Sequence, residues 1–381
     1  MQSLVKAVYF LNPLMWYAPA AVETSAMRLL PRLAALLFLF SSFGPAQDRL
    51  QVVSTTPLSK NILMRLGGGK RVSCPQDGGT LFGLTPAVDT NWRMTHELIA
   101  LKEDGTPRAM IDLDKVPGMG MAFIEDFAPG PDGEIYVAAK KIVATHSAVD
   151  QKGQIYERYH EEDPQLWVLR FSDTGRVIAV TPIQAEFAYV HLGVFPSGSF
   201  LVVGYLSQAS LPGEPPPKDI PYAAIFSREG KLVREVKLPN IVLIPEPRDY
   251  GSVEQQIPML GADGNMYVVV EPSEKPALTV LHPNGAVSGT VQLRIPDGFT
   301  LTDTQLAGQR LIANADEIKL RNGLQQVLEL NVGTGDLVKV HSLPEVGLRL
   351  SCQTNPQGIV VLGRGGLDTL VVGGDDNSKR H

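Results

Sequence analysis

The chain has 381 residues, of which 44% are hydrophobic and 19% charged, and its formal net charge is −6. This ordinary apolar content, with Gly and Pro at about 17% against a usual 12% or so, excludes a disordered chain, a coiled coil and a collagen. The acidic balance argues against a nucleic-acid or anionic-membrane binder, because such proteins carry a basic excess.

The N-terminal segment carries the pattern of a secretory signal. Arg28 and Arg32 form a basic region, Leu33–Phe40 an apolar core, and small residues stand at −3 and −1 of a cut before Gln47. The apolar run is shorter than the ~20 residues that span a bilayer, although an uncleaved anchor is the alternative. The pattern predicts export to a periplasm or the outside, with no membrane span in the mature chain.

Translation is predicted to start at Met27, since a complete signal begins there. The predicted parts are an upstream extension (1–26), a signal peptide (27–46), one folded domain (47–372) and a polar C-terminal tail (373–381).

Beyond Gln47, short runs rich in Val, Ile, Leu and Tyr alternate with glycine turns, which is typical of β-hairpins. One kind of turn recurs six times, as in Pro129–Val137, where Asp132-Gly133 precedes the strand. The turn glycines are Gly78 (with Gly79), Gly133, Gly198, Gly264, Gly308 and Gly358. Tyr136 and Tyr267, three residues after such glycines, are interpreted as packing residues.

A second kind of hairpin lies between these turns. Its five complete copies are Ile99–Leu113, Leu166–Val180, Ala223–Leu238, Ala277–Leu293 and Val327–Val340. A sixth copy offers a single strand, Thr369–Val372, and an unpartnered strand, Leu50–Ser54, stands early in the mature chain. Because these two strands complete each other, we expect the N-terminal strand to close the last repeat.

Two hairpins make a four-stranded antiparallel sheet with open edges, and radial repetition of such sheets protects the edges. The period of roughly 45–65 residues is typical of propeller blades. The sequence therefore predicts an all-β, six-bladed β-propeller with four antiparallel strands in each blade. Residues 127–138 and 166–175 resemble the NHL-type six-bladed repeat. That resemblance implies a fold whose members include protein-binding modules, a lyase and metal-holding lactonase relatives.

In a propeller the strand before each first turn lines the central channel. Counting back from the turn glycines places polar residues at one level of these strands: Arg71, Asp126, His191, Gln256 and Ser351, with Glu125, Asp303 and Gln353 close by. Such a ring can bind a ligand or a divalent cation, and His191 with Asp126 can serve in acid–base catalysis. The alternative is a polar wall that only contacts water.

Two insertions interrupt the period. Ala144–Gln165 is predicted to be a loop in the second blade, in which Tyr156, Tyr159 and His160 are candidate ligand contacts, and Ser207–Pro221 a loop in the third. A solvated loop without a ligand is the alternative. Long loops at a channel mouth often bind partners.

Cys74 and Cys352, the two cysteines of the chain, fall on inner strands of the first and sixth blades. Those blades become neighbours when a ring closes, so the pair is a candidate disulfide in an exported protein. Two buried free thiols are the alternative.

These features favour a monomeric exported propeller that binds a protein, peptide or glycan through its loop-bearing face, with no resident cofactor and no nucleic acid. A metal-dependent hydrolase or lyase with its site at the channel mouth is the alternative function. A purely structural or sensory ectodomain is a third.

Overall fold

A computed structural model gives the fold of the chain. It describes residues 48–60, 62, 72–73, 80–83, 97–102, 104–120, 122–149, 155–206, 220–238, 258–270, 275–317, 325–344, 349–355, 358–363 and 365–372. The predicted loop Ser207–Pro221 is described only from Ile220 onward, and the extension, signal and tail lie outside these residues.

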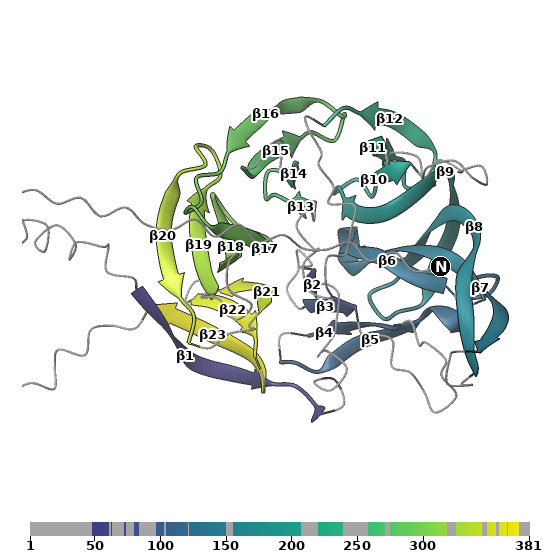
Figure 1. Cartoon of the computed structure of the whole chain (residues 1–381), viewed down its shortest axis with the longest axis horizontal. Helices are drawn as coiled ribbons and strands as arrows, with labels where there is room; N and C mark the ends of the chain where they lie inside the picture. The colour runs from purple at the N-terminus through teal and green to yellow at the C-terminus, as the bar shows by residue number, and fades with distance from the viewer. Residues whose placement is uncertain are drawn as a thin grey trace, which may run out of the picture. The chain divides into compact units, whose positions relative to one another are not determined.

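The described part of the chain is all-β, with almost no helix and several four-stranded antiparallel arrays, consistent with a propeller-like fold (Figure 1). Four consecutive strands form the first sheet: β2 (Val72–Ser73), β3 (Thr80–Gly83), β4 (Glu97–Leu101) and β5 (Pro107–Asp112). A second four-stranded sheet consists of β13 (Met259–Leu260), β14 (Met266–Val270), β15 (Ala277–Leu281) and β16 (Val287–Gln292). No helix among the described residues is long and apolar enough to cross a membrane.

A seven-stranded sheet contains two predicted four-stranded sets that share one strand. Its strands are β6 (Ala122–Pro129), β7 (Ile135–Val149), β8 (Ile155–Phe171), β9 (Val177–Val194), β10 (Phe200–Leu206), β11 (Ile220–Phe226) and β12 (Leu232–Val236). The shared strand β9 has 18 residues; its first part pairs with β8 and its last part with β10. The separate sheets expected here are therefore joined, because β9 continues without a break.

The remaining sheet has eight strands in the order β17-β18-β19-β20-β1-β23-β22-β21. Their bounds are β17 (Phe299–Ala307), β18 (Arg310–Glu317), β19 (Gln325–Asn331), β20 (Leu337–Ser342), β1 (Asp48–Pro57), β21 (Arg349–Asn355), β22 (Gly358–Leu362) and β23 (Gly366–Val372). The first strand β1 lies beside the last strand β23 and pairs with it antiparallel, with Leu50 opposite Val372 (Figure 1). It also pairs with β20 in parallel over two residues.

The five predicted outer hairpins are confirmed as the pairs β4–β5, β8–β9, β11–β12, β15–β16 and β19–β20. Each turn contains the expected glycine at positive φ, namely Gly105, Gly175, Gly230, Gly285 and Gly335. Only glycine adopts this conformation without strain, which is why these turns were readable in the sequence.

The expectation of a loop over Ala144–Gln165 is wrong. Strands β7 and β8 continue through this region as a two-stranded ribbon, with Ile142 opposite Glu161 and Val149 opposite Ile155. Both arms contain β-branched and aromatic residues, which favour strands, among their polar residues.

Six hydrophobic clusters lie between sets of strands. Their locations are β4–β5 against β6–β8, β6–β8 against β9–β11, β10–β12 against β14–β15, β13–β15 against β17–β19, β18–β19 against β1 with β22–β23, and β4 against β22–β23. The core is therefore divided into layers between successive sets of strands, filled mainly by Leu, Val, Ile, Ala and Phe side chains.

The outer turns pack against the strand set that precedes them. Gly175 lies against Ala109 of β5, and Gly335, which follows β19, lies so close to the Gln292 carbonyl oxygen of β16 that a Cβ atom would collide with it. Gly105 approaches β1 in the same manner, with its Cβ position 2.9 Å from the Pro57 carbonyl oxygen.

Tyr136 has the packing role that the sequence predicted. Its side chain is fully buried, its ring lies across Gly130, and its hydroxyl donates a hydrogen bond to the Gly198 carbonyl oxygen at 3.2 Å. Burial raises the pKa of the Tyr136 hydroxyl, so the group is a neutral donor at physiological pH.

Candidate functional site

Asp126 and His191, both singled out in the sequence, come together from strands β6 and β9. One carboxylate oxygen of Asp126, Oδ2, lies 3.7 Å from Nδ1 of the His191 ring. The same oxygen accepts a hydrogen bond of 2.6 Å from the backbone N–H of Leu192. Asp126 is thus attached to the backbone next to His191, and the two side chains form a carboxylate–imidazole pair.

The two members of the pair differ in exposure. The side chain of Asp126 is 2% exposed and that of His191 is 19% exposed. Nδ1 of His191 is buried and has no hydrogen-bond partner among the described residues, so the exposed part of the side chain belongs to its other atoms. The other ring nitrogen, Nε2, is the one that does not face Asp126.

Both strands are irregular at the pair. In β6 the register shifts between Ile124 and Asp126, which makes Glu125 the extra residue of a β-bulge. In β9 the register shifts between Ala188 and His191. Bulges redirect side chains and are frequent beside functional sites. Half-buried Glu125 therefore lies next to the carboxylate–imidazole pair at a point where the ladder is locally interrupted.

The chemistry of the pair follows from these positions. A carboxylate beside one ring nitrogen selects the tautomer in which that nitrogen carries the proton, and the other nitrogen can then accept a proton or hydrogen bond. The 3.7 Å separation is longer than a hydrogen bond.

The structure describes some of the other predicted channel residues and not others. Arg71 and Gln256 lie outside the described residues. Asp303 lies in β17, where the register also shifts, and Ser351 and Gln353 lie at an irregularity of β21.

Tyr156, Tyr159 and His160 lie in β8, in the ribbon described above. Their backbone partners in β7 are Ala148, Ala144 and Val143 respectively. These candidates belong to a strand rather than to the loop that the sequence predicted.

The sequence raised the possibility of a divalent cation in the channel. Among the residues that the structure describes, no three His, Cys, Asp or Glu side chains gather closely enough to hold an ion. The divalent cation in the channel stays an expectation from the sequence.

Only one of the two cysteines falls on the described residues. Cys352 is in β21, and Cys74, outside the described residues, directly follows β2. Strand β21 contacts both β2 and β3. The proposed disulfide stays a prediction.

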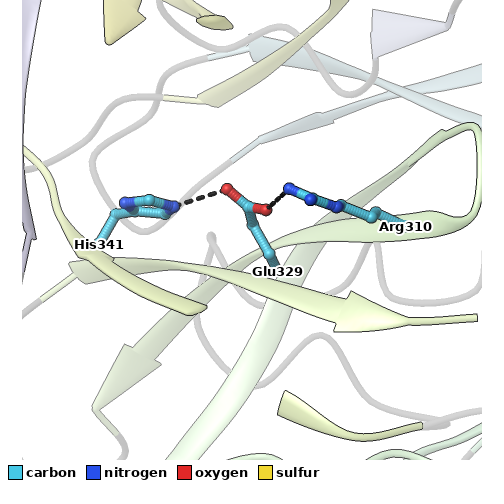
Figure 2. Close-up of polar contacts among 3 residues, drawn as sticks. All are labelled: Arg310, Glu329 and His341. Carbon is cyan, nitrogen blue, oxygen red and sulfur yellow. Dashed lines mark hydrogen bonds and ion pairs between the residues drawn. The ribbon is translucent and has the colours of Figure 1, made fainter. Parts of the chain in front are cut away.

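A second polar cluster, which the sequence analysis missed, joins Arg310, Glu329 and His341 (Figure 2). Glu329 Oε1 accepts a hydrogen bond of 2.7 Å from His341 Nε2, when that nitrogen carries the proton, and Oε2 pairs with the Arg310 guanidinium. The hydrogen bond from His341 and the charge of Arg310 lower the pKa of the Glu329 carboxyl against the opposing effect of burial. Glu329 is therefore ionised in the folded protein at neutral pH.

The sequence carries one sign of this cluster, which is an acidic residue inside an otherwise apolar strand. Glu329 stands within Val327–Leu330, every residue of which is buried. A buried carboxylate requires partners, and they come from the flanking strands β18 and β20.

No protein-family model and no curated protein sequence matches the chain. Among solved structures, a protein of unknown function from Bacteroides caccae shares 13% identity over 72% of this chain and 81% of its own, with a TM-score of 0.43. A luciferin-regenerating enzyme shares 9% identity over 84% of this chain and 93% of its own, with a TM-score of 0.47. The PQQ-bound aldose sugar dehydrogenase of Streptomyces coelicolor shares 11% identity over 86% of this chain and 98% of its own, with a TM-score of 0.44.

Proposed function

We propose that this chain is an exported six-bladed β-propeller, closed by its N-terminal strand, that binds a protein, peptide or glycan ligand at His191. Six hydrophobic clusters support the ring: five join strand sets that follow each other in the chain, and the sixth joins β4 to β22–β23. The approach of Gly105 to Pro57 repeats at β1 the contact that other outer turns make with the preceding set.

Export rests on the signal pattern of residues 27–46. Strand β1 begins at Asp48, directly after the residue that would become the mature N-terminus. Expression of the whole sequence from Met27 in a bacterium, followed by N-terminal sequencing of the exported fraction, tests this part. A mature chain beginning at Gln47 is expected, and retention of the uncleaved chain in the cell would contradict export.

The observation that carries the binding function is the Asp126–His191 contact. Asp126 is buried and hydrogen-bonded to the backbone, so its carboxyl group is held in place beside Nδ1. The imidazole is partly exposed, and its other nitrogen suits a hydroxyl or amide N–H of a ligand. A side chain fixed by its neighbours loses little conformational entropy on binding, which favours affinity.

A glycan and peptide array probed with labelled protein tests the binding. The protein is compared with the variants His191→Ala and His282→Ala. His282 is the control, because its Nδ1 also faces one polar side chain, that of Asn265 at 2.8 Å, at a place away from β6 and β9. We expect binding that His191→Ala abolishes and His282→Ala preserves; equal binding by all three proteins would refute the site.

A second function, acid–base catalysis in a hydrolase or lyase, is favoured by the orientation of the ring. A carboxylate beside Nδ1 is the arrangement that prepares Nε2 to accept a proton. Elemental analysis of the protein and a hydrolase and lyase screen test this function. An activity that falls in His191→Gln, and in Asp126→Asn to a lesser degree, is expected. An activity that both variants retain in full would exclude His191 as the base.

A further inference from the structure

The Arg310–Glu329–His341 cluster occupies three adjacent strands, with Glu329 in the middle strand (Figure 2). The side chains of His341 and Glu329 are 1% and 10% exposed, whereas that of Arg310 is 56% exposed. Nδ1 of His341 has no hydrogen-bond partner among the described residues. The bond to Glu329 is thus the polar contact that orients the His341 ring.

His341 is also the residue at which the N-terminal strand joins β20. In the short parallel ladder Asp48 is opposite His341 and Arg49 is opposite Ser342. From Leu50 onward β1 pairs with β23 instead. A ladder of two residues contributes little stability by itself, so it depends on a fixed position of the end of β20.

The cluster adjoins the hydrophobic contacts of the same strand. Val327 is opposite His341 and Ile312 is opposite Glu329 in their ladders. Both belong to the hydrophobic cluster that contains the buried Leu50 of β1. Because residues opposite each other share one face of a sheet, the polar cluster and the contacts of Leu50 lie on the same face.

We propose that the Arg310–Glu329–His341 network is a latch for the N-terminal strand. It fixes the end of β20 to which Asp48 and Arg49 pair, and its release frees residues 48–50 while the ladder with β23 persists from Gln51 onward. Local opening of this kind requires less free energy than global unfolding and belongs to a strand end with few contacts. The latch is independent of the ligand site at His191.

Hydrogen–deuterium exchange of the purified protein, read by mass spectrometry, tests the latch. The variant Glu329→Gln keeps the size of the side chain and removes its charge. We expect the start of β1, residues 48–50, to exchange on the order of tenfold faster, as for loss of about 1.4 kcal/mol from a charged hydrogen bond. Strand β10 and residues 54–57 should keep their rates. Unchanged exchange at residues 48–50, or a uniform increase over the whole chain, would overturn the latch.

A matched control lies at the opposite end of β20. Asp336 pairs with Arg294 at 2.6 Å just before β20 begins, and Asp336→Asn removes this ion pair without touching the network. We expect no acceleration at residues 48–50 in this variant, and an acceleration equal to that of Glu329→Gln would contradict the proposal. If Glu329→Gln fails to fold, Arg310→Gln breaks the network from its exposed side. It should accelerate exchange at the same residues, and unchanged rates would again overturn the latch.

Discussion

The backbone N–H of Leu192 in β9 donates a hydrogen bond of 2.6 Å to the carboxylate of Asp126 in β6. A buried side chain from one set of strands thereby supports the backbone of the first strand of the next set. Since His191 precedes Leu192, the same bond holds the carboxylate next to the backbone that carries the imidazole. Structure and proposed site therefore depend on one residue.

Replacement of Asp126 by alanine should lower stability. Leu192 would lose its acceptor at a buried position, which costs about 1–3 kcal/mol. Asp126→Asn keeps an acceptor oxygen and should lose less. Urea unfolding followed by fluorescence measures both variants, and equal stability of the alanine variant and the unmodified protein would contradict the bond.

Leu50→Ala tests how strongly β1 holds the fold. Leu50 is 1% exposed in β1, so its truncation leaves a cavity that costs about 2–5 kcal/mol. Val53, in the same strand, is 56% exposed, and Val53→Ala should change stability by less than about 0.5 kcal/mol. Denaturant midpoints separate the two cases; similar losses would mean that β1 does not pack as described.

Glu329 should make the folded state sensitive to acid. Its pKa is lowered in the folded protein, chiefly by the hydrogen bond from His341, relative to about 4.3 when unfolded. Its contribution to stability is therefore fully present above the unfolded pKa. It is lost as the pH falls through the lower folded pKa. Thermal unfolding from pH 7 to pH 2 should show a smaller loss of Tm in Glu329→Gln, and parallel curves would show that Glu329 does not contribute.

Two glycines with similar positive φ separate the cost of backbone strain from the cost of a steric clash. Gly308 has φ +60° with no atom within 4 Å of its Cβ position, whereas Gly335 has φ +70° and faces the Gln292 carbonyl oxygen. Gly308→Ala should cost about 1–2 kcal/mol from the left-handed backbone. Gly335→Ala should cost clearly more. Equal losses of unfolding free energy would mean that β16 does not approach this turn.

Cys74 and Cys352 should be joined in the exported protein. Strand β21, which contains Cys352, contacts β2, which ends directly before Cys74 in the sequence. Closing such a long loop stabilises a fold by up to about 5 kcal/mol when the bond is unstrained. Peptide mapping without reductant should yield one cross-linked peptide that reduction separates. A free thiol at either position would exclude the bond.

The sequence predicted the features that depend on single residues in turns. Asp-Gly, Asn-Gly, Thr-Gly and Glu-Gly pairs mark the outer hairpins because the glycine has positive φ in each. Asp126 and His191 were found because both lie seven residues before a turn glycine, at the same level of successive strands.

Features that depend on how far a strand continues could not be predicted in this way. The ribbon of β7 and β8 contains polar and charged residues that are typical of a loop as much as of an exposed strand. The length of β9 depends on ladders to both neighbours, which local composition does not encode. Glu329 finds its two partners through pairing over residues 310–341, so no short motif contains them.

The pairing of Leu50 with Val372 has a consequence for protein engineering. The two ends of the folded unit lie side by side, so a short flexible linker could join them and new termini could be opened in an exposed turn elsewhere. Such a circular permutant would turn the paired strands β1 and β23 into a continuous hairpin. The order in which the sheets are synthesised would change, while every ladder of the fold would be kept.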